Sequence, residues 1–146
     1  MDKRKIILAV GSIAIDAIET PNGNRKELLG GSASYFAVAA GLFAPVKLVG
    51  VVGDDYPEEG WQMFQSRGIN VDNVHVQPGK TFRWGGKYNN DYSLRDTLFT
   101  DLGVFENFIP SIKAEDCASP LIFLGNIQPD LQLRVAHLAS GAEHVV

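Results

Sequence analysis

Two neighbouring segments decide the fold: GGSASYFAVAA at residues 30–40 and VKLVGVVG at residues 46–53. The first opens with two glycines and continues rich in alanine, a composition that favours a helix beginning after the glycines. The second is an almost unbroken apolar run, which is typical of a strand buried on both faces of a mainly parallel sheet. Residues 5–11, KIILAVG, have the same character. The resulting order of strand, helix and strand predicts a parallel α/β unit.

The rest of the chain extends this unit in both directions. A further strand is expected at residues 13–19, a turn at 21–24 and a short helix between Pro57 and Gly68. Residues 120–125 are expected to resume the buried sheet, and residues 129–140 to form a helix. We interpret residues 143–146 as the first part of another strand, at which the sheet is truncated.

Helical periodicity also predicts which side chains are buried. Ser32 is expected to be the N-cap of the first helix, whose buried face would include Phe36, Ala40 and Phe43. In the helix at 129–140, the positions available to the core are Leu133, Ala136 and Leu138.

The composition changes between residue 69 and about residue 100, where aromatic and polar residues alternate and Asn89-Asn90-Asp91 indicates a turn. This pattern predicts a small antiparallel excursion from the main sheet, at residues 76–101. Alternation places Phe82 and Trp84 on one face of that strand and Arg83 on the other.

Charge and composition exclude several classes of function. The 146 residues carry a net charge of -4 with no block of Lys or Arg, so we expect no nucleic acid or membrane partner. The one cysteine and three scattered histidines show no metal-ligand spacing, so no metal site is inferred. A small, uncharged ligand and a cytoplasmic location are the expectations that remain.

Four motifs occur in a characteristic order: GSIAID at 11–16, GGSASYFAVAA at 30–40, VGVVGDD at 49–55, and Gly60. Together they resemble the N-terminal half of the PfkB, or ribokinase-like, family of sugar and nucleoside kinases. The resemblance covers most of residues 5–76 and continues more loosely to Asn126. It implies a three-layer α/β fold, in which a mainly parallel sheet, here truncated, has helices on its faces and carries a small antiparallel β lid. Residues 1–146 would then be the N-terminal part of one such domain, with 76–101 as the lid.

The resemblance also implies an activity. PfkB kinases transfer a phosphoryl group from ATP to a hydroxyl of a sugar or nucleoside with the help of Mg2+, and their catalytic Asp lies in a Gly-Ala-Gly-Asp motif of the C-terminal half. That motif is absent here. We therefore assign no catalytic residue, expect no ATP or Mg2+ on this chain alone, and expect the chain alone to be inactive. One alternative is a noncatalytic sugar-binding or assembly module built on half of the fold, and another is an unrelated α/β protein with purely structural glycines.

Seven residues are candidates for substrate binding on this resemblance: Asp16, Gly30, Gly31, Tyr35, Phe82, Trp84 and Asn126. An ionised Asp16 could accept hydrogen bonds from two hydroxyls, although a strand-edge Asp without a ligand has the same pattern. Gly30 and Gly31 could let the backbone approach a sugar, or could simply form a tight turn.

The remaining candidates have equally plain alternatives. Tyr35 stands where ribokinase-like sequences often have Asn, and it could contact the substrate or belong to the helix core. Phe82 and Trp84 could cover the apolar face of a sugar, or pack on a partner subunit. Asn126 follows a strand, where ligands of α/β sheets gather, but it also suits a turn. We expect a homo-oligomer formed through the lid or the truncated sheet edge.

Overall fold

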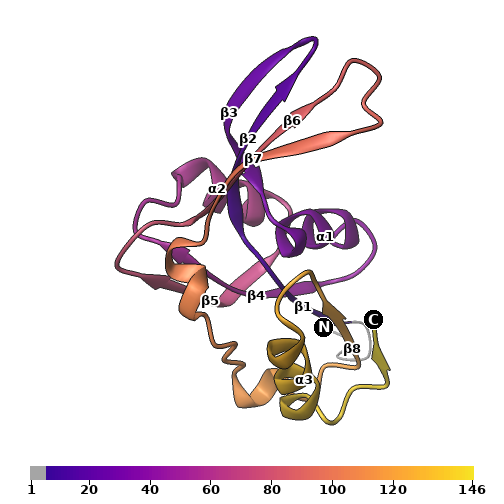
Figure 1. Cartoon of the computed structure of the whole chain (residues 1–146). Helices are drawn as coiled ribbons and strands as arrows, with labels where there is room; N and C mark the ends of the chain where they lie inside the picture. The colour runs from indigo at the N-terminus through magenta and orange to yellow at the C-terminus, as the bar shows by residue number, and fades with distance from the viewer. Residues whose placement is uncertain (1–5) are drawn as a thin grey trace.

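The main sheet of this computed structural model, which describes residues 6–146, is entirely parallel (Figure 1). Its five strands stand in the order β5-β4-β1-β8-β9, and each pairs in parallel with its neighbour. The predicted buried strands are therefore confirmed, although Lys5, at the start of the first of them, lies outside the described residues. The strands are β1 (Ile7–Val10), β4 (Val46–Gly53), β5 (Asn70–Gln77), β8 (Leu121–Leu124) and β9 (His144–Val145).

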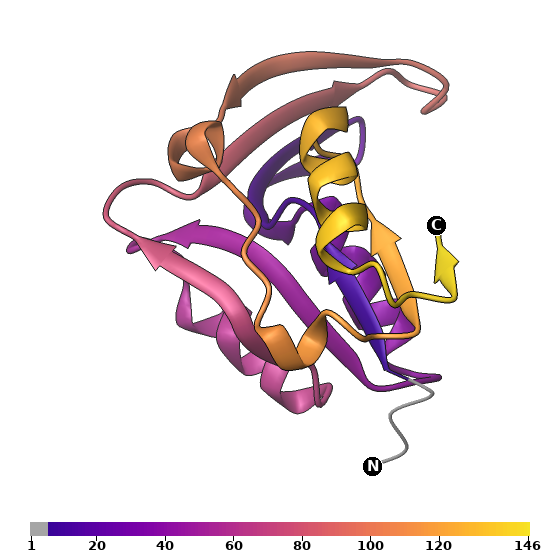
Figure 2. The same cartoon turned by 90° about the horizontal axis from the view of Figure 1, so that it is seen from below.

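Helices cover both faces of this sheet. On one face, α1 (Ser32–Ala40) and α2 (Glu58–Ser66) pack on a cluster that includes Ala9 and Leu48. On the other, α3 (Pro129–Leu138) packs on a cluster that includes Leu8 and Val10 (Figure 2). Consecutive residues of β1 enter different clusters because side chains alternate along a strand. The predicted three-layer α/β architecture is confirmed.

A second sheet of four strands projects from the main sheet as two hairpins (Figures 1 and 2). It has the order β3-β2-β6-β7, and we call it the lid sheet. Its strands are β2 (Ala14–Thr20), β3 (Gly23–Gly30), β6 (Phe82–Tyr88) and β7 (Arg95–Asp101).

The lid sheet is mixed, whereas the sequence suggested an antiparallel one. Each hairpin is antiparallel, but β2 and β6 pair in parallel, because both leave the main sheet from the carboxyl end of a parallel strand. The lid sheet also draws half of its strands from residues 14–30, and residues 76–77 still belong to β5.

The buried faces of two helices differ from the expected ones. In α3, Val135 is buried and the expected Ala136 is half-buried, whereas Leu133 is 57% and Leu138 41% exposed. In α1, Phe36 stacks on Phe123 of β8 with ring centroids 3.6 Å apart, but the helix ends at Ala40, which leaves Phe43 88% exposed. Apolar spacing predicted both helices correctly, but it did not determine which stripe faces the sheet.

The segment between the lid sheet and β8 contains two 3-10 helices, η2 (Gly103–Asn107) and η3 (Ala114–Asp116). Asp116 is buried and pairs with Lys47 of β4, and it accepts a hydrogen bond of 2.7 Å from Asn73 Nδ2 of β5. A buried carboxylate requires such partners, so this network attaches the segment to the main sheet. Among the described residues, no helix is long and apolar enough to cross a membrane.

Candidate functional site

A cavity of about 510 Å³ lies between the lid sheet and the N-terminus of α1. Six of the seven candidate residues line it, from four separate parts of the chain: Asp16, Gly31, Tyr35, Phe82, Trp84 and Asn126. The exception is Gly30. Six further residues complete the lining: Ser12, Ala14, Ile18, Ser32, Tyr88 and Arg95.

Asp16 faces the cavity because it lies on the same side of β2 as Ala14 and Ile18. Its side chain is half-buried, and no hydrogen bond or ion pair to it occurs among residues 6–146. Burial without a compensating donor disfavours the charged form, and it raises the pKa of this carboxyl above its ordinary value. A partly desolvated carboxylate in a cavity, with its acceptor positions open, is typical of a binding site.

Gly30 acts on the cavity through Asp16. A Cβ atom at Gly30 would overlap the Asp16 carboxyl group, so the absent side chain gives that carboxyl its space. Gly31 has φ 98°, a conformation that favours glycine, and a Cβ there would overlap the carbonyl of Ser12. Gly30 thus makes room for Asp16 and Gly31 satisfies a backbone requirement, whereas the close approach of a sugar to this pair stays a prediction.

Ser32 is the first residue of α1 rather than its N-cap, which is Gly31. Its hydroxyl accepts hydrogen bonds from the backbone N–H of Ser12 at 3.4 Å and of Asn126 at 3.1 Å. In return, the backbone N–H groups of Ser32 and Ala33 donate to the hydroxyl and the carbonyl of Ser12, at 2.9 and 3.0 Å. The start of α1 is therefore tied to the ends of β1 and β8, and its first two donors are already used.

Aromatic side chains form much of the cavity wall. Tyr35 is 63% exposed, so it belongs to the rim of the cavity and not to the helix core. Its pKa is raised by burial, and further by the charges of Asp16 and Tyr88. Phe82 also stacks on Phe105 of η2, with ring centroids 5.4 Å apart, so that it braces the base of the lid sheet.

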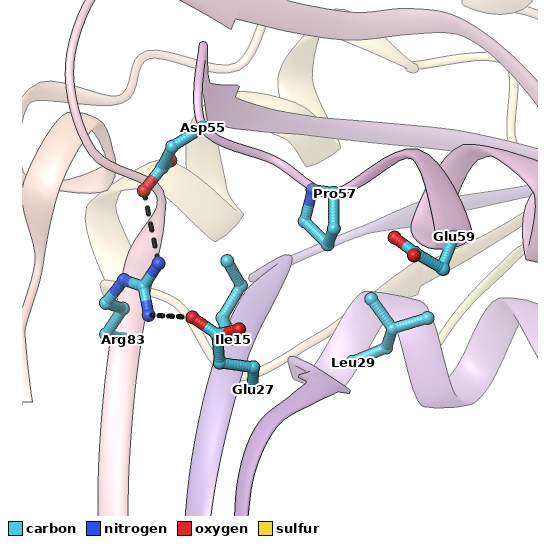
Figure 3. A pocket seen from close by; sticks show the side chains of 7 residues that line it. All are labelled: Ile15, Glu27, Leu29, Asp55, Pro57, Glu59 and Arg83. Atoms are coloured by element: carbon cyan, nitrogen blue, oxygen red, sulfur yellow. Dashed lines mark hydrogen bonds and ion pairs between the residues drawn. The ribbon is translucent and has the colours of Figure 1, made fainter.

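A second hollow, of about 350 Å³, lies beside the opposite face of the lid sheet (Figure 3). There Arg83 lies 3.3 Å from Asp55 and 3.7 Å from Glu27, so its side chain is on the other side of β6 from Phe82 and Trp84, as alternation predicted. Asp55 also accepts hydrogen bonds from the N–H of Thr81 at 2.7 Å and from its hydroxyl at 2.8 Å.

These contacts determine the charge state of Asp55. Burial, the largest influence, opposes ionisation, but the two Thr81 hydrogen bonds together with Arg83 and Lys80 outweigh it and lower the pKa of this carboxyl. Because the charges of this second hollow are largely paired with one another, we interpret it as the junction between the lid sheet and the main sheet.

Sequence reasoning missed Arg95 and Ser12 as parts of the cavity. Arg95 lies opposite Tyr88 across the β6–β7 hairpin, so the pairing register could have indicated it. That register contains an irregularity between Gly85 and Gly86, which the sequence does not specify. Ser12 carries no signal beyond its place in the first motif.

Comparisons with known proteins bear on this arrangement. A scan against protein-family models found no match. Among curated proteins, a cytidine kinase of Thermococcus kodakarensis is 30% identical over 138 residues, which cover 92% of this chain and 48% of that kinase.

Solved structures share the fold. A nucleoside kinase of Methanocaldococcus jannaschii, an archaeal member of the ribokinase family, matches 97% of this chain and 51% of its own, with a TM-score of 0.71 and 22% identity. A ribokinase of Cryptococcus neoformans var. grubii, solved with ADP, matches 82% of this chain and 41% of its own, with a TM-score of 0.65 and 22% identity. The chain spans about half the length of these relatives. It therefore has a partial ribokinase-like kinase fold, which confirms the resemblance recognised in its motifs.

Proposed function

We propose that this chain forms the acceptor-binding part of an ATP-dependent kinase that phosphorylates a hydroxyl of a sugar or nucleoside. The observation that carries the proposal is the Asp16 carboxylate, which faces the cavity with no partner among residues 6–146. A carboxylate accepts hydrogen bonds and donates none when ionised, so vicinal hydroxyl groups are its natural ligands. The similarity to a cytidine kinase and a ribokinase supports the same class of acceptor.

The residues of the chain contribute binding and orientation. Asp16 would hold two hydroxyls of the acceptor, while Phe82, Trp84 and Tyr35 would cover its apolar surface and exclude water. Phosphoryl transfer depends on such positioning and on stabilisation of charge, and a fixed acceptor converts the reaction into an effectively unimolecular step.

The nucleotide and its metal ion do not fit the residues described here. Residues 6–146 contain no group of three or more His, Cys, Asp or Glu side chains that could hold a metal ion. The first two N–H donors of α1 are already bonded to Ser12, so they do not offer an anion site. In the proposed enzyme, we expect residues other than those described here to bind ATP and Mg2+, and we expect this chain alone to perform no transfer.

Binding and transfer can be tested separately. We would titrate the chain with D-ribose, D-fructose and uridine by calorimetry, and repeat the titrations with Asp16→Asn and with Asp54→Asn, which removes an exposed carboxylate outside the cavity. We expect Asp16→Asn to abolish binding and Asp54→Asn to preserve it. Equal binding by both variants would refute the role of Asp16.

The transfer assay uses ATP, Mg2+ and the same acceptors. Phosphorylation of any of these acceptors by the chain alone would refute the proposal that this chain binds the acceptor but performs no transfer. If a longer chain that includes a Gly-Ala-Gly-Asp motif bound sugars without phosphorylating them, the noncatalytic binding module would be the better description.

A further inference from the structure

The indole of Trp84 occupies the space beside Gly86 on its own strand. A Cβ atom at Gly86 would overlap the six-membered ring of Trp84, and Gly86 itself is buried. The two residues share one face of β6, so the missing side chain at position 86 leaves the space that the indole occupies. Gly86 thus determines the orientation of the largest aromatic group in the cavity wall.

Arg95 lies over the ring of that indole. Its guanidinium carbon lies 4.7 Å from the centroid of the Trp84 ring, in cation–π contact, and the Arg95 side chain is exposed and lines the cavity. Arg95 reaches the ring from β7, where it pairs with Tyr88.

Asp16 completes a row across the lid sheet. Asp16 and Trp84 are direct partners in the β2–β6 pairing, and the row ends with the Arg95 guanidinium, which lies over the Trp84 ring. No ion pair joins Asp16 and Arg95 among the described residues. The row thus offers hydrogen-bond acceptors at Asp16, an aromatic ring at Trp84 and hydrogen-bond donors at Arg95.

A bare sugar uses only part of this row. Its hydroxyls can donate to Asp16 and accept from Arg95, but it carries no planar ring to stack on the indole. A molecule that joins a hydroxyl-bearing ring to a planar heteroaromatic ring with acceptor atoms at its edge matches all three members. Its planar ring can take the place of Arg95 on the indole, and the displaced guanidinium then meets the acceptors at the edge of that ring.

We propose that Gly86 and Arg95 are specificity-determining residues, which make Trp84 and its surroundings a receptor for the planar, acceptor-bearing ring of a nucleoside. This inference rests on the proposed function, because it assigns the hydroxyl-bearing part of the same ligand to Asp16. Gly86 positions the indole without touching the ligand, and Arg95 binds the edge of the planar ring.

The test compares uridine with methyl β-D-ribofuranoside, which keeps the ribose hydroxyls and lacks the base. Binding to the 146-residue chain is followed by the NMR signal of the Trp84 indole N–H, which Trp61→Phe identifies because the chain has two tryptophans. We expect uridine to bind at least about tenfold more tightly than the methyl riboside, as stacking of a base on an aromatic ring predicts.

Two variants and two matched controls test the assigned residues. Gly86→Ala and Arg95→Ala are each expected to weaken uridine binding about tenfold and to weaken methyl riboside binding by much less. Gly85→Ala is the control for the first, because its Cβ would meet Phe99 on the opposite face of the same strand. Lys87→Ala is the control for the second, because it removes one positive charge of β6 outside the cavity.

The outcomes separate the inference from the function on which it rests. Equal affinity for the two ligands, or a preference for uridine that survives both Gly86→Ala and Arg95→Ala, would overturn the inference and leave the proposed acceptor site intact. An unchanged or higher affinity for uridine in Arg95→Ala would alone remove Arg95 from the proposal. Failure of both ligands to bind the unmodified chain would overturn the proposed function and the inference together.

Discussion

Thr81 joins the lid sheet to the main sheet, and its replacement by Val is a sharp test of that junction. The side chain is fully buried just before β6, and its hydroxyl accepts a hydrogen bond of 3.0 Å from the N–H of Gly53 while it donates one of 2.8 Å to Asp55. Valine has nearly the same shape, so Thr81→Val removes both bonds and leaves packing almost unchanged.

The loss in the free energy of unfolding follows from the hydrogen bonds that Gly53 and Asp55 lose. The Gly53 N–H is buried and would be left without an acceptor, which costs about 1–2 kcal/mol. Asp55 would keep the Thr81 N–H and Arg83 but lose one hydrogen bond to a charged acceptor, which costs about 1.5 kcal/mol. We therefore expect a loss of about 3 kcal/mol in the free energy of unfolding, or a Tm lower by roughly 6–12 °C for a chain of this size.

Urea denaturation followed by circular dichroism measures this loss, with Thr97→Val, at an exposed position of β7, as the control. The pH dependence gives a second check. The lowered pKa of Asp55 means that its contribution to stability is complete above the ordinary Asp value and is lost as the pH falls through the lower folded value. Thr81→Val should reduce that acid-induced loss. A variant within about 0.5 kcal/mol of the parent chain would refute the assigned role of Thr81.

Three further predictions concern other parts of the chain. Asp16→Asn should raise stability at neutral pH, because the raised pKa of Asp16 means that its ionised form destabilises the folded state. The stability gained by the variant should shrink as the pH falls through that raised pKa. Urea titrations from pH 4 to pH 7 that show no such trend would contradict this prediction. In the same assay, Val135→Ala should lower the free energy of unfolding by about 2 kcal/mol, and Leu133→Ala should hardly change it. A larger loss for Leu133→Ala than for Val135→Ala would mean that the helix buries the face expected from the sequence. Light scattering should give a mass above that of one 146-residue chain, and Leu98→Glu, at an exposed position of β7, should lower it; a monomeric parent chain would refute oligomerisation through the lid.

Local pattern determined the elements of this protein well, for a physical reason. The strands β1 and β4 are buried on both faces, so nearly every residue in them must be apolar, and that requirement is visible in the sequence itself. The alternation along β6, which separates Arg83 from Phe82 and Trp84, was predictable in the same way. The motifs around Asp16 and Gly31 contain residues that line the cavity.

Only the tertiary structure decided how those elements meet. The parallel pairing of β2 with β6 brings Asp16 beside Trp84, although 67 residues lie between them in the sequence, and no local pattern specifies that register. The same holds for Gly30, whose missing side chain accommodates the Asp16 carboxyl, and for Gly86, which accommodates the indole. The sequence shows that a residue is glycine, but it does not show which group occupies the space of the missing side chain, because long-range packing determines that group. The sequence by itself determined which residue types the site contains, and tertiary pairing determined which of them became neighbours.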